Sequence, residues 1–200
     1  MKHLLWIALL APRLLAHDFW IEPGTRSLRV GEHFEGETVR GNAPVVLLER
    51  NGATLFAYRS REFANHEMPR EKFEQYLREE GLTRIRPTGA VQRERFARFA
   101  KSIVKGAPEA AGPLGWRFEL VPLSPSRFQL LYEGKPLADA LIVAMNRSKQ
   151  RLAARTDAEG TVTFDLGAGA WLIKSVHMVE APADSGVKWE SLWASLTFEK

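Results

Sequence analysis

The sequence predicts a mainly β protein, built as antiparallel immunoglobulin-like β-sandwich modules with one short helical insertion. Short extended segments alternate with turn residues along most of the chain, an Asn-Gly pair separates two apolar runs, and one stretch near residues 70–80 carries helical spacing. We expect an N-terminal β-rich module over residues 17–125 and a C-terminal β-sandwich module over residues 126–200.

A β-hairpin is the clearest local prediction in the first half of the chain. The apolar runs at residues 45–48 and 55–58 flank Asn51-Gly52. Both residues of an Asn-Gly pair accept the positive φ that a two-residue hairpin turn requires. A further short strand is predicted at residues 18–21, just before a Glu-Pro-Gly break.

The helical insertion is predicted at residues 69–81. Phe73, Tyr76 and Leu77 recur at helical spacing, Pro69 suits a helix start, and Gly81 suits a helix end. Residues 91–104 are ambiguous, because their apolar spacing fits a helix whereas their aromatic and β-branched content fits a strand.

The second half of the chain is predicted to form a succession of short strands. Residues 106–115 form a loop by composition, and the prolines at 122 and 125 mark the expected boundary between modules. From Phe128 onward, apolar runs alternate with Gly, Pro and Asp turns, as in a small sandwich. In the strand at residues 170–179, alternation places His177 on the same face as Trp171 and Ile173.

Residues 1–16 are predicted to be a secretory signal peptide. Lys2 precedes an apolar run at residues 4–11, which is too short to span a bilayer, and Ala16 supplies the small residue before a cut. Cleavage would leave His17 as the N-terminus of a periplasmic or secreted protein. An uncleaved membrane anchor or a shifted cut are the alternatives.

Composition excludes several kinds of site. The chain has no cysteine, so disulfides and thiolate metal sites are ruled out. The net charge of +4 falls close to neutrality when Lys2 and Arg13 are removed, which argues against nucleic acid as a partner. Because the usual nucleophile, zinc-protease and phosphate-loop motifs are also lacking, the sequence does not predict an enzyme.

His17 is the strongest candidate metal ligand. A free N-terminal histidine offers an amine and an imidazole, both of which coordinate transition metals as neutral nitrogen donors. Asp18 could add a carboxylate, and His33 lies in an acidic stretch that could attract a cation. His177 is a third imidazole, although a histidine on an apolar strand face commonly packs in a core.

Two resemblances add to these expectations. The segments at residues 134–140, 156–160 and 169–172 resemble the β-sandwich pattern of carboxypeptidase-regulatory-like domains. The segments at residues 17–20, 30–36, 174–178 and 193–198 together resemble the domain of unknown function 4198 family, which includes proteins described as periplasmic components of nickel and cobalt uptake systems. This second resemblance implies export, a β-rich fold that favours a strand at residues 91–104, and metal handling through His17, His33 and His177.

The expected function is therefore that of an exported metal-binding accessory protein. It would capture a divalent transition metal, with nickel or cobalt favoured by the resemblance and copper also compatible, and deliver it to a membrane transporter. The metal ligands would be His17, His33 and His177, with Asp18 adjacent. One alternative is a copper enzyme resembling the histidine-brace oxygenases, and another is a metal-free β-sandwich interaction module.

Overall fold

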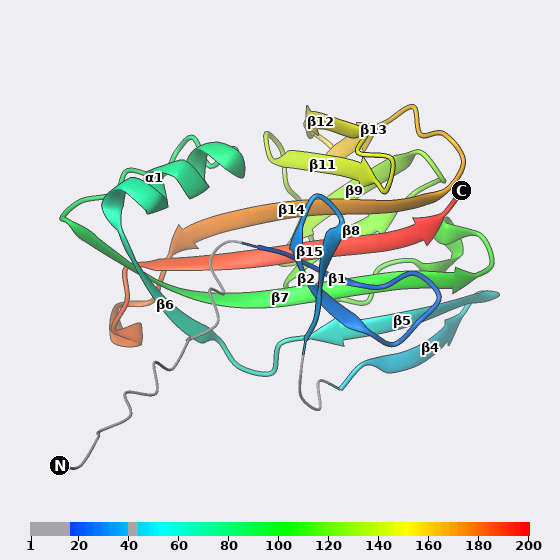
Figure 1. Ribbon diagram of the computed structural model, residues 1–200, viewed down its shortest axis with the longest axis horizontal. Helices are drawn as coiled ribbons and strands as arrows, with labels where there is room; N and C mark the ends of the chain where they lie inside the picture. The colour runs from blue at the N-terminus through cyan, green and yellow to red at the C-terminus, as the bar shows by residue number, and fades with distance from the viewer. Residues whose placement is uncertain (1–16, 40–43) are drawn as a thin grey trace, which may run out of the picture.

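The computed structural model describes residues 17–39 and 44–200, and it shows a mainly β protein with one α-helix (Figure 1). The predicted signal peptide at residues 1–16 lies outside the described residues. Within the described part of the chain, no helix is long and apolar enough to cross a membrane.

The first half of the chain contributes three short strands, a hairpin, the helix and one long strand. Their bounds are β1 Asp18–Ile21, β2 Leu28–Glu32, β3 Glu35–Thr38, β4 Val46–Arg50, β5 Ala53–Arg59, β6 Ala64–Pro69, α1 Arg70–Glu79 and β7 Val91–Lys105.

The second half is built from shorter strands followed by two long ones. Their bounds are β8 Phe118–Pro122, β9 Arg127–Tyr132, β10 Lys135–Pro136, β11 Leu141–Asn146, β12 Arg151–Arg155, β13 Thr161–Thr163, β14 Ala170–Glu180 and β15 Trp189–Glu199.

These strands form three sheets. The largest has eight strands, with the order β12-β11-β14-β15-β7-β5-β4 and with β6 also paired to β7. A four-stranded sheet joins β8, β9, β10 and β13, and a three-stranded sheet joins β1, β2 and β3. Most pairings are antiparallel, but β7 and β15 run parallel to each other.

The four-stranded sheet packs on one face of the large sheet and makes the β-sandwich. Phe118, Phe128 and Leu130 from the small sheet are fully buried against Trp171 and Leu196 of the large sheet. Burial of such large apolar side chains is the main favourable term in folding. We call this the inner face of the large sheet.

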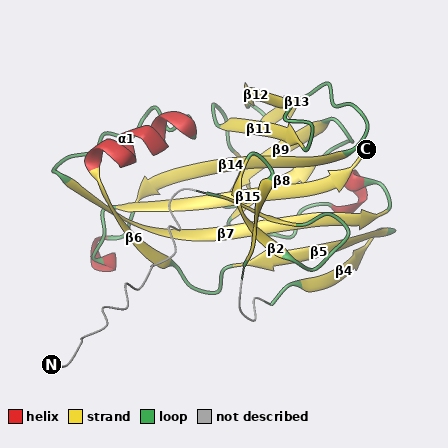
Figure 2. Ribbon diagram, viewed as in Figure 1, coloured by secondary structure: helices red, strands yellow, loops and turns green. Residues whose placement is uncertain are grey.

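The opposite, outer face is covered by α1 and by the three-stranded sheet (Figure 2). The helix buries Phe73 and Tyr76 on Trp189 and Trp193, and the rings of Tyr76 and Trp193 stack with centroids 5.5 Å apart. The three-stranded sheet buries Trp20 on the same face, next to Leu172. The two covers leave a polar gap between them, which is where the candidate site lies.

Two local predictions are confirmed, since the Asn51-Gly52 hairpin joins β4 and β5 and the helix occupies residues 70–79. Residues 91–105, whose conformation the sequence pattern alone left open, form a strand, as the family resemblance favoured. The expected boundary near residue 125 lies between β8 and β9, which pair with each other, and the large sheet combines strands from both sides of it. The two expected modules therefore share both the sandwich core and the central sheet.

Candidate functional site

A tight turn between β2 and β3 sets the position of His33. Glu32 and Glu35 pair across the hairpin, so that His33 and Phe34 form a two-residue loop with φ of 55° and 62°. Phe34 is fully buried and packs edge-on against Trp20, with ring centroids 5.7 Å apart. Because Phe34 anchors the turn on the sheet, His33 is held exposed at the surface.

Gly31 and Gly36 allow the two strands of this hairpin to approach closely. They lie opposite each other, and a Cβ at Gly31 would stand 2.1 Å from the carbonyl oxygen of Glu35. Glycine is therefore the residue that fits there.

His17 precedes β1 and meets the carboxylate of Glu32 from the neighbouring strand. Its Nδ1 lies 3.2 Å from Glu32 Oε1. This contact lacks hydrogen-bond geometry, and Nδ1 has no hydrogen-bond partner among the described residues although it is shielded from solvent. A surface hollow is lined by His17, Gly31, Glu32, His33, Glu35 and Lys149, and we call it the His17 hollow.

Asp18 makes a different contact, because it belongs to a buried ion-pair cluster. The ammonium group of Lys174 on β14 pairs with the carboxylates of Asp18 and of Glu80, the latter at 2.8 Å. Asp18 and Glu80 are each only 6% exposed. Lys174 thus ties the first strand to the end of α1 and to the large sheet.

Burial and ion pairing have opposite effects on the pKa values of Lys174 and Glu80 in this cluster. Burial by itself lowers the pKa of Lys174, but the carboxylates of Asp18 and Glu80 together outweigh burial and raise that pKa. Burial raises the pKa of Glu80, and the Lys174 ammonium offsets only part of the rise. Two carboxylates share one cation, so the cluster carries a net negative charge when all three groups are ionised.

A second hollow of about 360 Å³ opens beside this cluster, and we call it the Lys174 hollow. It shares Glu32 and His33 with the His17 hollow, so the two form one continuous region. Carboxylates outnumber the basic side chains of Lys and Arg along it. The carboxylates are Asp18, Glu32, Glu35, Glu79 and Glu80, and the basic side chains are those of Lys149, Arg151 and Lys174.

His177 points away from this region. It stands three residues after Lys174 on β14, so the two side chains face opposite sides of the sheet. Its imidazole packs against the rings of Phe118 and Tyr132, with centroids 5.9 and 4.6 Å away. Burial, with a smaller contribution from the nearby Arg117 guanidinium, lowers the pKa of His177 to about 4.

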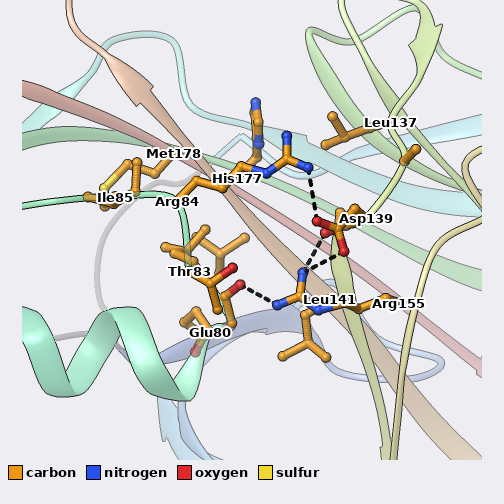
Figure 3. A pocket seen from close by; sticks show the side chains of 15 residues that line it. Glu80, Thr83, Arg84, Ile85, Leu137, Asp139, Leu141, Arg155, His177 and Met178 are labelled. Carbon is orange, nitrogen blue, oxygen red and sulfur yellow. Dashed lines mark hydrogen bonds and ion pairs between the residues drawn. The ribbon is translucent and has the colours of Figure 1, made fainter.

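His177 also lines a third hollow, which lies where β14 continues beyond its pairing with β11 and has only Glu80 in common with the Lys174 hollow (Figure 3). Arg84 and Arg155 both form ion pairs with Asp139 at this hollow. The structure therefore brings His17, Asp18 and His33 to one region and leaves His177 outside it. Within residues 17–39 and 44–200, no group of three or more His, Asp or Glu side chains is already placed to hold a metal ion.

Sequence reasoning missed two members of the site, Glu80 and Lys174, and treated Glu32 only as part of an acidic stretch. A signal for Lys174 was present, because it is a charged residue in the middle of a strand face that also carries Leu172, Val176 and Met178. Such a residue is rarely left buried without a partner. Glu80, at the end of the helix, carried no comparable signal.

Residues 14–179 match the family model described as "Domain of unknown function (DUF4198)". The chain belongs to this family. The match begins just before His17 and extends to the end region of β14, so it includes every residue of the site described above. No curated protein and no solved structure matches the chain.

Proposed function

We propose that this DUF4198 protein is an exported accessory protein that captures a divalent transition metal at the His17 hollow. The observation that carries the proposal is the position of His17 Nδ1, 3.2 Å from the Glu32 carboxylate and without a hydrogen-bond partner among the described residues. A buried polar atom without a partner is costly, and a metal ion would satisfy it.

The chemistry of an N-terminal histidine supports this position. After removal of residues 1–16, the His17 amine and its Nδ1 could bind one ion in a chelate ring, and Glu32 Oε1 already faces Nδ1 as an oxygen donor. His33 lines the same hollow and would supply a second imidazole. Nitrogen donors with one carboxylate suit nickel, cobalt and copper.

The neighbouring charges support capture and release of a cation rather than its permanent retention. The excess of carboxylates raises the local concentration of cations. Imidazole and amine donors bind a metal only when deprotonated, so mild acidification would release it. Delivery to a membrane uptake system, which the family resemblance suggests, is part of the proposal.

Calorimetric titration of nickel, cobalt and copper into two forms of the protein tests the proposal. One form begins at His17 and the other carries one extra alanine before it. We expect one ion per chain in the first form and about a 100-fold weaker affinity in the second, equivalent to roughly 2.7 kcal/mol, because the amine is blocked. Equal affinity in both forms would refute a role for the processed terminus.

Two side-chain variants locate the site independently of the terminus. Glu32→Gln should weaken binding by about tenfold, or roughly 1.4 kcal/mol, because a neutral amide replaces an anionic ligand. Glu37→Gln is the matched control, since Glu37 lies exposed on the same hairpin but does not line either hollow. If the two variants bind the metal alike, Glu32 is not a ligand.

The metal that binds most tightly in these titrations would distinguish a nickel or cobalt uptake protein from a copper protein.

A further inference from the structure

A groove at the β4 edge of the large sheet is unrelated to the His17 hollow. It has a volume of about 560 Å³, and we call it the arginine groove. Leu48 and Ala57 form its floor on the inner face of the sheet, and Leu114 and Trp116 form a wall. The lining residues are Pro44, Val46, Leu48, Arg50, Ala57, Arg59, Arg61, Leu114 and Trp116.

The wall of the groove is held by a buried carboxylate. Glu119 accepts hydrogen bonds from the backbone N–H groups of residues 114, 115 and 116, at 2.6, 3.1 and 3.1 Å. The same carboxylate pairs with Lys101 at 2.8 Å, and both side chains are 1% exposed. Through these hydrogen bonds and the ion pair, Glu119 fixes the Trp116 segment to Lys101 of the large sheet.

The charge of the groove is positive. Arg50, Arg59 and Arg61 line it, and no Asp or Glu does. In the described part of the chain, Arg59 and Arg61 take part in none of the ion pairs, and Arg50 donates to the carbonyl oxygen of Pro113 at 2.8 Å. Three guanidinium groups beside an apolar floor and an indole favour an anionic partner with apolar side chains.

The floor of the groove ends at the edge strand of the sheet. Among the described residues, β4 pairs only with β5, so its other side is a sheet edge (Figure 1). Val46 and Leu47 on this strand are 48% and 45% exposed. Edge strands that avoid pairing usually carry charge or proline, whereas β4 carries charge only at its last two residues, Glu49 and Arg50. Its apolar part, residues 46–48, is therefore suited to strand addition.

We propose that the β4 edge binds an extended acidic segment of a partner protein as an added strand. Arg50 lies opposite Ala53, and Arg59 lies beyond Ala57 on β5, so the two arginines are about 20 Å apart along the strand at roughly 3.3 Å per residue. In a seven-residue added strand, residues 1, 3, 5 and 7 would face the groove. Residues 1 and 7 would be acidic, and residues 3 and 5 would be apolar. Carboxylates at both ends meet the arginines, and the apolar pair covers Val46 and Leu48.

A second copy of this chain fits the groove poorly. Two β4 strands paired across a two-fold axis would bring arginine-lined grooves together, and like charges destabilise such a pairing. Charge complementarity therefore assigns the edge to a partner of opposite charge.

A labelled peptide of sequence Glu-Thr-Val-Thr-Val-Thr-Glu, with blocked ends, tests the proposal by fluorescence anisotropy. We expect binding in the range of about 10–100 µM, weakened by salt, as is typical of small interfaces. The matched peptide with lysine in place of glutamate should not bind. A double variant, Arg59→Gln with Arg61→Gln, should lose at least about tenfold in affinity, whereas Arg84→Gln, outside the groove, should retain it.

Backbone pairing is tested with the same acidic peptide methylated on its central amide nitrogens, which keeps the charges but blocks strand addition. Loss of binding supports an added strand. The proposal would be overturned if the methylated peptide or the lysine peptide bound as tightly as the acidic peptide. It would also be overturned if the double arginine variant bound the acidic peptide as tightly as the parent protein does. A dimer that forms with rising protein concentration and excludes the acidic peptide would assign the edge to a second copy and would also overturn it.

Discussion

Replacement of Lys174 by methionine should strongly destabilise the protein. Methionine keeps most of the side-chain volume but removes the ammonium group that pairs with Asp18 and Glu80. Both carboxylates are 6% exposed, so water cannot replace the lost partner. Removal of one member of a buried ion pair costs about 3–5 kcal/mol, and we expect Lys174→Met to lie in this range at neutral pH.

Urea unfolding followed by tryptophan fluorescence measures this loss. Arg84→Met is the matched control, because Arg84 pairs with Asp139 at 3.0 Å but is 83% exposed, so it should cost less than about 1 kcal/mol. A triple variant that combines Lys174→Met with Asp18→Asn and Glu80→Gln should regain part of the lost free energy of unfolding. The two added changes remove the buried carboxylate charges that Lys174→Met leaves unpaired. A loss below about 1 kcal/mol for Lys174→Met would refute the inference that this cluster fastens β1 and α1 to the sheet.

Three further changes follow from the structure. The folded-state pKa of His177, about 4, lies below the ordinary 6.5, so its contribution to stability is complete above pH 6.5 and is lost as the pH falls to about 4. His177→Gln should therefore flatten the pH dependence of the melting temperature across that window, and a pH dependence equal to that of the parent protein would refute this expectation. Gly31→Ala should cost about 2–3 kcal/mol in urea unfolding, because its Cβ would stand 2.1 Å from the Glu35 carbonyl oxygen; an unchanged midpoint would mean that the hairpin can widen freely. Glu119→Gln should cost about 3–5 kcal/mol by leaving Lys101 buried without its charge partner, and a near-neutral result would show that the ion pair does not hold the Trp116 segment.

Local patterns predicted the elements well. Asn51-Gly52 specified a hairpin through its own backbone preferences, and Phe73, Tyr76 and Leu77 specified the buried side of a helix. Alternation also placed His177 on the face of Trp171 and Ile173, which is the inner face. These signals succeed because each depends on neighbours within a few residues.

Long-range pairing could not be read in the same way. The parallel pairing of β7 with β15 joins residues that are far apart in sequence, and no local pattern encodes its register. The position of His17 depends on such contacts, because Glu32 reaches it from a neighbouring strand and Lys174 fixes the adjacent Asp18 from the second half of the chain. Of the three histidines that were expected to converge, only His17 and His33 line a common hollow, together with Glu32 and Glu35.

The last strand of the chain, β15, occupies the middle of the largest sheet, between β14 and β7. A ribosome adds these residues after those of all the other described strands, and they are the ones that join the two halves of the large sheet. Until they emerge, β7 and β14 both lack a neighbour, and the sheet cannot close. A chain shortened before Trp189 would leave one edge of β7 and one edge of β14 without a paired strand, so we expect such truncations to aggregate. Modest changes at Lys200 should be tolerated.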